Sequence, residues 1–61
     1  MTAQETAARL ATIYGGTNAA ALAIGINRAS LSRILSGQVQ PGSSLEAHLT
    51  RALRQAEEVQ G

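Results

Sequence analysis

Two arginines, Arg28 and Arg33, stand in a central stretch of the chain that is otherwise small, apolar or uncharged. This stretch, TNAAALAIGINRASLSRILSG at residues 17–37, contains no other charged residue. A guanidinium group carries a planar fork of donors that matches the O6 and N7 atoms of guanine. The same side chain on a helix can instead belong to an ordinary solvated face. Which role applies depends on the elements that position the two arginines.

Other residues with reactive side chains are few. The chain has no cysteine and one histidine, which excludes a disulfide framework and leaves no ligand set for zinc. Ser30, Ser32, Glu46 and His48 are the residue types of a hydrolytic triad, but they lack the spacing of a nucleophile motif. We therefore expect no enzyme, no catalytic residue, no metal and no cofactor, and we expect His48 to be an ordinary surface or interface histidine.

The charges are distributed unevenly, although the net charge of the 61-residue chain is only +1. Residues 1–42 carry three arginines against one glutamate. The remainder carries both signs, and there we expect Arg51 and Arg54 to pair with Glu57 and Glu58 along one helix. The first part of the chain is therefore the basic part.

Length and hydropathy indicate one small cytoplasmic domain over residues 1–61. No stretch approaches the roughly 18 apolar residues of a membrane span, and the N-terminus does not have the form of a signal peptide. A chain of 61 residues is near the lower limit for a single hydrophobic core, which favours a second subunit.

Periodicity predicts an all-α fold, a compact bundle of four or five short helices. The four clear helices are expected at residues 3–14, 18–24, 28–36 and 44–58, with no pattern typical of strands. Glycines follow the first three, and GQVQPGSS at residues 37–44 is expected to be a loop. The expected N-terminal caps are Thr2 with Glu5 for the first helix, Thr17 or Asn18 for the second, Asn27 for the third, and Ser43 with Glu46 for the fourth.

The second and third helices have the spacing of a helix-turn-helix. Ala21 is small enough for a close helix crossing, and Gly25, four residues later, can redirect the chain. Leu31 and Ile34 then direct the inner face of the third helix onto the body of the domain. The run formed by Ala21, GINRASLSRILSG at residues 25–37, and Pro41 resembles the Cro/C1-type repressor domains of the Xre family of helix-turn-helix regulators. The resemblance covers residues 17 to about 54.

This resemblance implies that the third helix enters the major groove of double-stranded DNA. Because the sequence indicates no second domain, we expect no small-molecule ligand. Base edges would be read by Arg28, Ala29, Ser32 and Arg33. Phosphates would be held by Thr17, Asn18, Asn27, Ser36 and Gln38.

The implied regulator is a minimal Cro-like protein of a phage or mobile element, nucleoid-associated when bound and acting as a repressor, with its own promoter as the expected target. Because one protomer makes few phosphate contacts, a homodimer on a palindromic, inverted-repeat operator is expected. Leu49, Leu53 and Ala56 of the fourth helix either form the dimer interface or fill the core. The alternative function is a protein-interaction module, such as an antitoxin or adaptor, without sequence-specific DNA binding.

Overall fold

Helices account for most of the chain. The computed structural model describes residues 2–60 and consists of α1 (Ala3–Tyr14), α2 (Thr17–Ile24), α3 (Arg28–Ser36) and α4 (Ser43–Gln60), with no strand in that part of the chain. The expected all-α bundle is therefore confirmed, with four helices. The bounds agree closely, since α2 and α4 each begin one residue earlier than expected and α4 ends two residues later.

The first and third helices begin where their capping residues indicated. The Thr2 hydroxyl accepts a hydrogen bond from the Glu5 amide at 3.1 Å, and the Glu5 carboxylate accepts one from the Thr2 amide at 3.5 Å. The Asn27 side chain accepts from the Ala29 amide at 2.8 Å. Each cap satisfies amides that a helix leaves without an internal partner at its start.

The expected caps of the second and fourth helices are wrong. Gly16 precedes α2 and makes no side-chain hydrogen bond, so Thr17 and Asn18 already lie inside the first turn. Ser43 likewise lies inside α4, where the Glu46 amide donates to the Gly42 carbonyl at 2.9 Å. In both helices the N-cap position is a glycine, one residue before the polar side chain that was expected to cap the helix.

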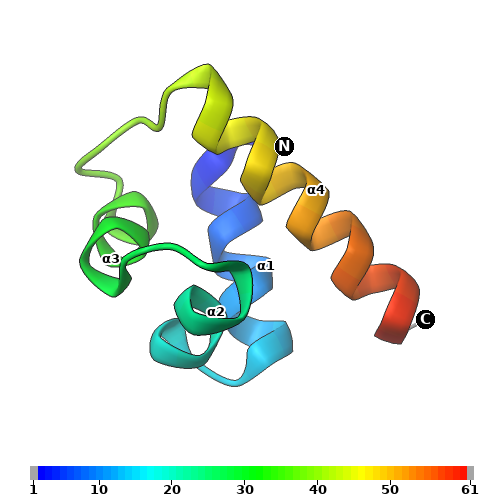
Figure 1. The fold of residues 1–61 in the computed structure, drawn as a ribbon. Coiled ribbons are helices and arrows are strands. Elements are labelled where there is room, and N and C mark those ends of the chain that lie inside the picture. The colour runs from blue at the N-terminus through cyan, green and yellow to red at the C-terminus, as the bar shows by residue number, and fades with distance from the viewer. Residues whose placement is uncertain (1, 61) are drawn as a thin grey trace.

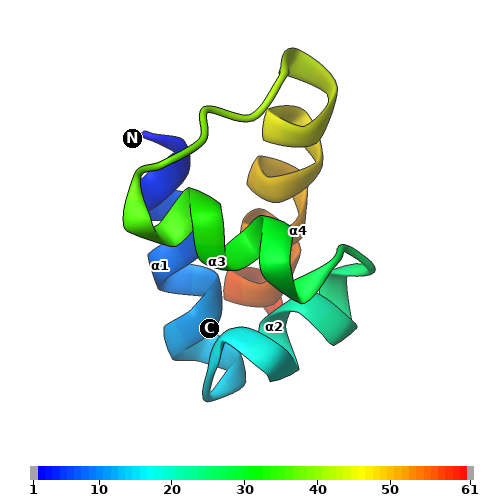
Figure 2. The same ribbon diagram turned by 90° about the vertical axis from the view of Figure 1, so that its left-hand side faces the viewer.

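The core lies where α1 meets the other three helices (Figure 1, Figure 2). The largest fully buried side chains are Leu10 of α1, Leu31 and Ile34 of α3, and Leu49 of α4. Five of the eleven buried apolar residues are alanines, which let short helices approach closely. They are Ala3, Ala7, Ala20, Ala21 and Ala56.

The helix pair α2–α3 packs on one side of α1, while α4 packs mainly on α1 itself. In Figure 2, α3 crosses the front of the molecule, with the end of α4 behind it. Within residues 2–60, no helix combines the length and apolar character needed to cross a bilayer. Among the described residues, none covers the outer surface of α3, whose side chains there are exposed.

Candidate nucleic-acid interface

The two faces of α3 differ sharply in composition. Its inner face buries Leu31 and Ile34 in the core. With about 100° of rotation per residue, the exposed outer positions fall within an arc of about 140°. These positions are Arg28, Ala29, Ser32, Arg33 and Ser36. The structure therefore brings all four expected base-reading residues onto one free surface.

A hydrogen bond joins the beginnings of α2 and α3. The Arg28 guanidinium donates to the Asn18 side-chain oxygen, with 3.3 Å between the two atoms. Asn18 is exposed, and it lies in the first turn of α2, whereas Arg28 is the first residue of α3. One expected base-reading residue and one expected phosphate-binding residue thus lie side by side.

The start of α2 presents backbone amides without a side-chain cap. The Ala20 amide is the one that donates to the Gly16 carbonyl, at 3.0 Å, so the amides of residues 17–19 precede the first intrahelical bond. Such amides, together with the positive end of the helix dipole, favour an anion. Thr17 itself is half-buried, so its backbone amide is better placed for that role than its side chain.

The remaining expected phosphate contacts lie at the two ends of α3. Asn27 precedes the helix and is exposed, although its side-chain oxygen is engaged by the Ala29 amide. Ser36 donates its hydroxyl to the Arg33 carbonyl at 3.0 Å. Gln38 is exposed in the following loop, and its amide donates to the same carbonyl at 3.0 Å.

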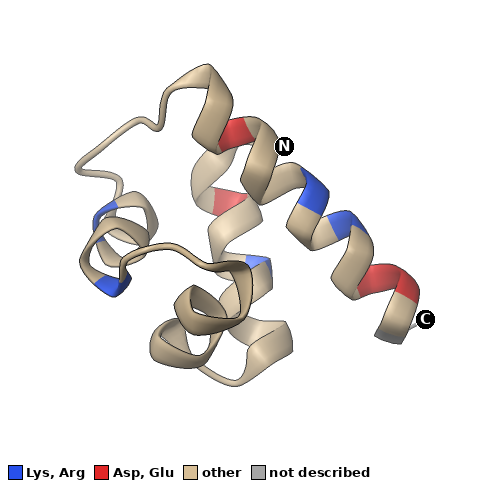
Figure 3. Cartoon of the chain, viewed as in Figure 1, with Lys and Arg blue, Asp and Glu red and all other residues tan. Residues whose placement is uncertain are grey.

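The segment that contains α2, α3 and the loop after them carries only positively charged side chains. Arg28 and Arg33 are the only charged residues between residues 10 and 45, and the glutamates lie on α1 and α4 (Figure 3). An anion approaching the outer face of α3 therefore meets no acidic side chain from α2, α3 or the loop that follows.

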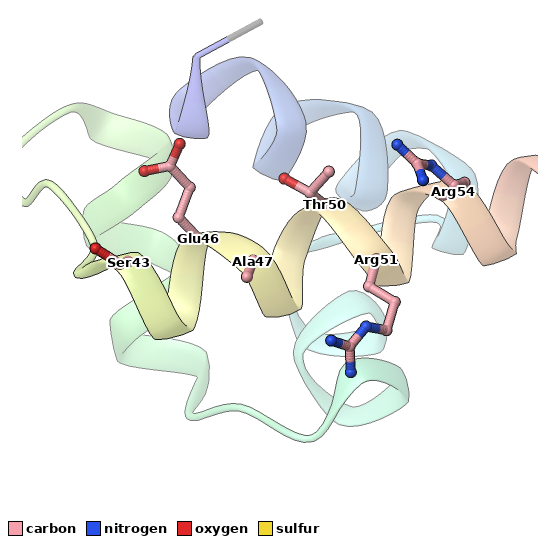
Figure 4. Close-up of a pocket in the computed structure, with 6 residues that line it drawn as sticks. All are labelled: Ser43, Glu46, Ala47, Thr50, Arg51 and Arg54. Carbon is pink, nitrogen blue, oxygen red and sulfur yellow. The ribbon is translucent and has the colours of Figure 1, made fainter.

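The arginines of α4 have a different environment. Arg51 and Arg54 line an open depression with Ser43, Glu46, Ala47 and Thr50, and their side chains point to opposite sides of the helix (Figure 4). Within residues 2–60, the structure contains one ion pair, between Arg9 and Glu57 at 3.7 Å. The expected pairing of Arg51 and Arg54 with Glu57 and Glu58 is therefore wrong, since Glu57 turns toward α1.

Of the two alternatives for the apolar stripe of α4, burial supports the core rather than a dimer interface. Leu49, Leu53 and Ala56 are at most 5% exposed and pack into the core of the protomer. The apolar face of α4 is buried because α4 packs on α1, and small alanines in the core let the helices approach closely. Large apolar side chains that stay on the surface are Tyr14, Leu22, Val39 and Val59.

Two residues that the sequence did not mark as important make long-range hydrogen bonds to α2 and α3. The Gln4 side-chain amide donates to the Leu35 carbonyl at 2.9 Å. His48 Nε2 lies 2.7 Å from the Ile24 carbonyl oxygen. Each contact joins residues more than twenty positions apart, so no local spacing could have revealed it.

No family model, curated protein or solved structure matches this chain. The functional argument therefore depends on the geometry of α2 and α3. That geometry combines an exposed polar helix face, two arginines in a segment without acidic residues, and an uncapped helix start within reach of Arg28.

Proposed function

We propose that this protein is a cytoplasmic, sequence-specific regulator that binds double-stranded DNA by placing α3 in the major groove. The observation that carries the proposal is the outer face of α3, where Arg28 and Arg33 flank the small side chains of Ala29 and Ser32. Small residues between the arginines let the helix approach base edges, and each bidentate arginine–guanine contact discriminates by about 1–3 kcal/mol.

Anchoring to the DNA backbone would come from the start of α2. Its uncapped amides can accept a phosphate, and Arg28 is held next to them by Asn18. Phosphate contacts at this end fix the register of α3 without reading sequence. The resemblance of the sequence to Xre-family domains implies the same roles for these elements.

Two protomers on an inverted repeat complete the proposal. A single copy with two arginines on its outer helix gains little counterion-release energy, and a dimer doubles it. The recognition helices would then lie about one DNA turn, 34 Å, apart. Because the inner face of α4 is buried, pairing must use another surface. By covering a promoter such a dimer would act as a repressor, and its own promoter is the proposed target.

The first test is selection from a random double-stranded DNA pool at about physiological salt. We expect enrichment of an inverted repeat with guanines at matched half-site positions. Replacing Arg28 and Arg33 together by glutamine should abolish this enrichment. The matched control replaces Arg51 and Arg54 by glutamine, which removes the same charge from α4 and should leave the selected sequence unchanged.

Salt dependence provides an independent measurement. With four to seven phosphate contacts in a dimer, log affinity should fall against log salt with a slope of about −4 to −6. A slope near zero, or no enrichment with the intact protein, would favour the alternative of a protein-interaction module that uses the same fold.

A further inference from the structure

The helix pair α2–α3 is tied to the rest of the domain by two side chains from outside the pair. His48 of α4 contacts the carbonyl of Ile24, the last residue of α2, at 2.7 Å. Gln4 of α1 donates to the carbonyl of Leu35, in the last turn of α3, at 2.9 Å. Each helix of the pair is thus held at its C-terminal end, and each by a different helix.

The carbonyls that receive these bonds are not used by the glycine caps. At the end of α2, the amides of Gly25 and Ile26 both donate to the Ala21 carbonyl at 3.0 Å. At the end of α3, the Gln38 amide donates to the Arg33 carbonyl at 3.0 Å. Such caps satisfy carbonyls one turn back and leave later ones without a backbone donor. Ile24 and Leu35 carry two of these remaining carbonyls.

Water could satisfy both carbonyls, so the two side chains contribute something that solvent does not: a fixed attachment point. Gln4 is exposed on α1, and its side chain also lies against Gly37, at 3.5 Å from where a Cβ would be. α4 packs mainly on α1, and the His48 bond links it directly to the end of α2. The two bonds therefore restrict rotation of α2 and α3 relative to the scaffold.

We propose that Gln4 and His48 are positioning residues of the DNA-binding surface. They hold the C-terminal ends of α3 and α2, so that the opposite ends, with Arg28 and the uncapped amides of α2, meet DNA in one orientation. This inference rests on the proposed function. The residues of a binding site must keep their positions to within about 0.5 Å. Helices of only eight and nine residues need tertiary contacts to keep such positions.

The His48 contact has a chemical signature of its own. A carbonyl oxygen only accepts, so the neutral imidazole must carry its proton on Nε2. The ¹⁵N shifts of the ring, measured at a pH where it is neutral, should show this tautomer in the intact protein. The opposite tautomer, or a rapid mixture of the two, would contradict the contact.

The test compares variants that remove one donor each. Gln4→Met keeps the side-chain length without the amide, and His48→Phe keeps a ring without the donor. His48→Gln restores a donor on α4. Gln55→Met is the matched control, because Gln55 is exposed on α4 beside the same depression as His48 and makes no side-chain hydrogen bond among the described residues.

Affinity is measured for the selected DNA and for a scrambled duplex, with folding checked by circular dichroism. Each of Gln4→Met and His48→Phe should weaken specific binding by about five- to tenfold, the effect of one lost hydrogen bond. Binding to scrambled DNA and the salt slope should stay within about twofold, since phosphate contacts are retained. His48→Gln and Gln55→Met should stay near the wild type. Equal losses on both duplexes would overturn the positioning role.

Amide hydrogen exchange reports on the same contacts without DNA. We expect faster exchange at Ile26 in His48→Phe and at Gln38 in Gln4→Met, with core amides of α1 and α4 unchanged. Unchanged exchange at these amides would overturn the positioning role even if DNA binding is sequence-specific. A wild-type protein that selects no DNA would instead overturn the proposed function, so the two failures are distinguishable.

Discussion

The α2–α3 pair and the α1–α4 pair of this domain differ in length and in charge. α1 and α4 have 12 and 18 residues, carry all the glutamates and form the one ion pair of the described chain. α2 and α3 have 8 and 9 residues, carry no acidic residue, and expose two arginines. The long helices stabilise the fold, and the short helices present a surface that has no other structural use.

The division is incomplete inside the core. α3 contributes Leu31 and Ile34, two of the four largest fully buried side chains, while α2 contributes mainly alanines. α3 is thus anchored in the core through its inner face. α2 is instead held by close packing and by contacts at its ends.

The largest expected effect tests whether the two pairs fold as one unit. Leu31→Ala and Leu49→Ala each remove a fully buried leucine, one from each pair, and each should lower the free energy of unfolding by about 2–5 kcal/mol. A domain of this size has only about 3–5 kcal/mol in total, so both variants should be largely unfolded at 37 °C. Urea denaturation followed by circular dichroism measures this.

The control for both is Leu22→Ala, which removes a leucine that is 85% exposed and should change stability by less than about 0.5 kcal/mol. A Leu31→Ala protein that loses only part of its helix signal, with α1 and α4 intact, would show that the two pairs are separate cooperative units.

The next effect concerns the turn between the short helices. Gly25 has φ +76°, and a Cβ at this position would have no atom within 4 Å, so Gly25→Ala isolates the cost of a left-handed backbone. We expect a loss of about 1–2 kcal/mol. Gly42→Ala is the matched control, because Gly42 also has open space but no left-handed φ. Gly42 precedes α4, where alanine is a poorer N-cap than glycine, and this cost offsets the entropy that alanine removes from the unfolded chain, so the change should stay within about 0.5 kcal/mol. Equal melting temperatures for the two variants would contradict this reading of the turn.

A smaller effect distinguishes the starts of the two short helices. Asn27→Ala removes the cap of α3 and should cost about 1 kcal/mol. Thr17→Ala removes a side chain that makes no cap, so its effect should be within about 0.5 kcal/mol. Thermal denaturation of both variants gives the comparison. A larger loss for Thr17→Ala would mean that the start of α2 is not available to a phosphate as proposed.

Most of the fold could be predicted from local sequence signals, because helix periodicity, glycines and the Thr2 and Asn27 caps act within a few residues. The outer face of α3 followed from the same periodicity. What could not be predicted depends on distant parts of the chain. The apolar stripe of α4 has the same sequence pattern whether it packs on α1 or on a second subunit. Only the burial of its residues in the structure shows that it packs on α1.

The contacts of Gln4 and His48 belong to the same class. Their partners are backbone carbonyls, which every residue possesses, so the sequence carries no mark of the pairing. The Arg9–Glu57 pair was missed for a related reason, since helical spacing offered Glu57 a partner on its own helix and tertiary packing supplied another.

The smallest expected effect concerns that ion pair and sharpens the electrostatic side of the comparison. The two side chains are 57% and 51% exposed, so a double-mutant cycle with Arg9→Gln and Glu57→Gln should give a coupling below about 0.5 kcal/mol. At 1 M salt, where charges are screened beyond about 3 Å, the coupling should vanish. Such a small coupling would mean that charges on α1 and α4 contribute little to the stability of the fold. The melting temperature should then stay nearly constant over the range of salt concentration in which the proposed DNA binding weakens steeply. A coupling above about 1 kcal/mol would instead mean that salt acts on the fold itself, and the slope of DNA binding could no longer be assigned to contacts made by α2 and α3.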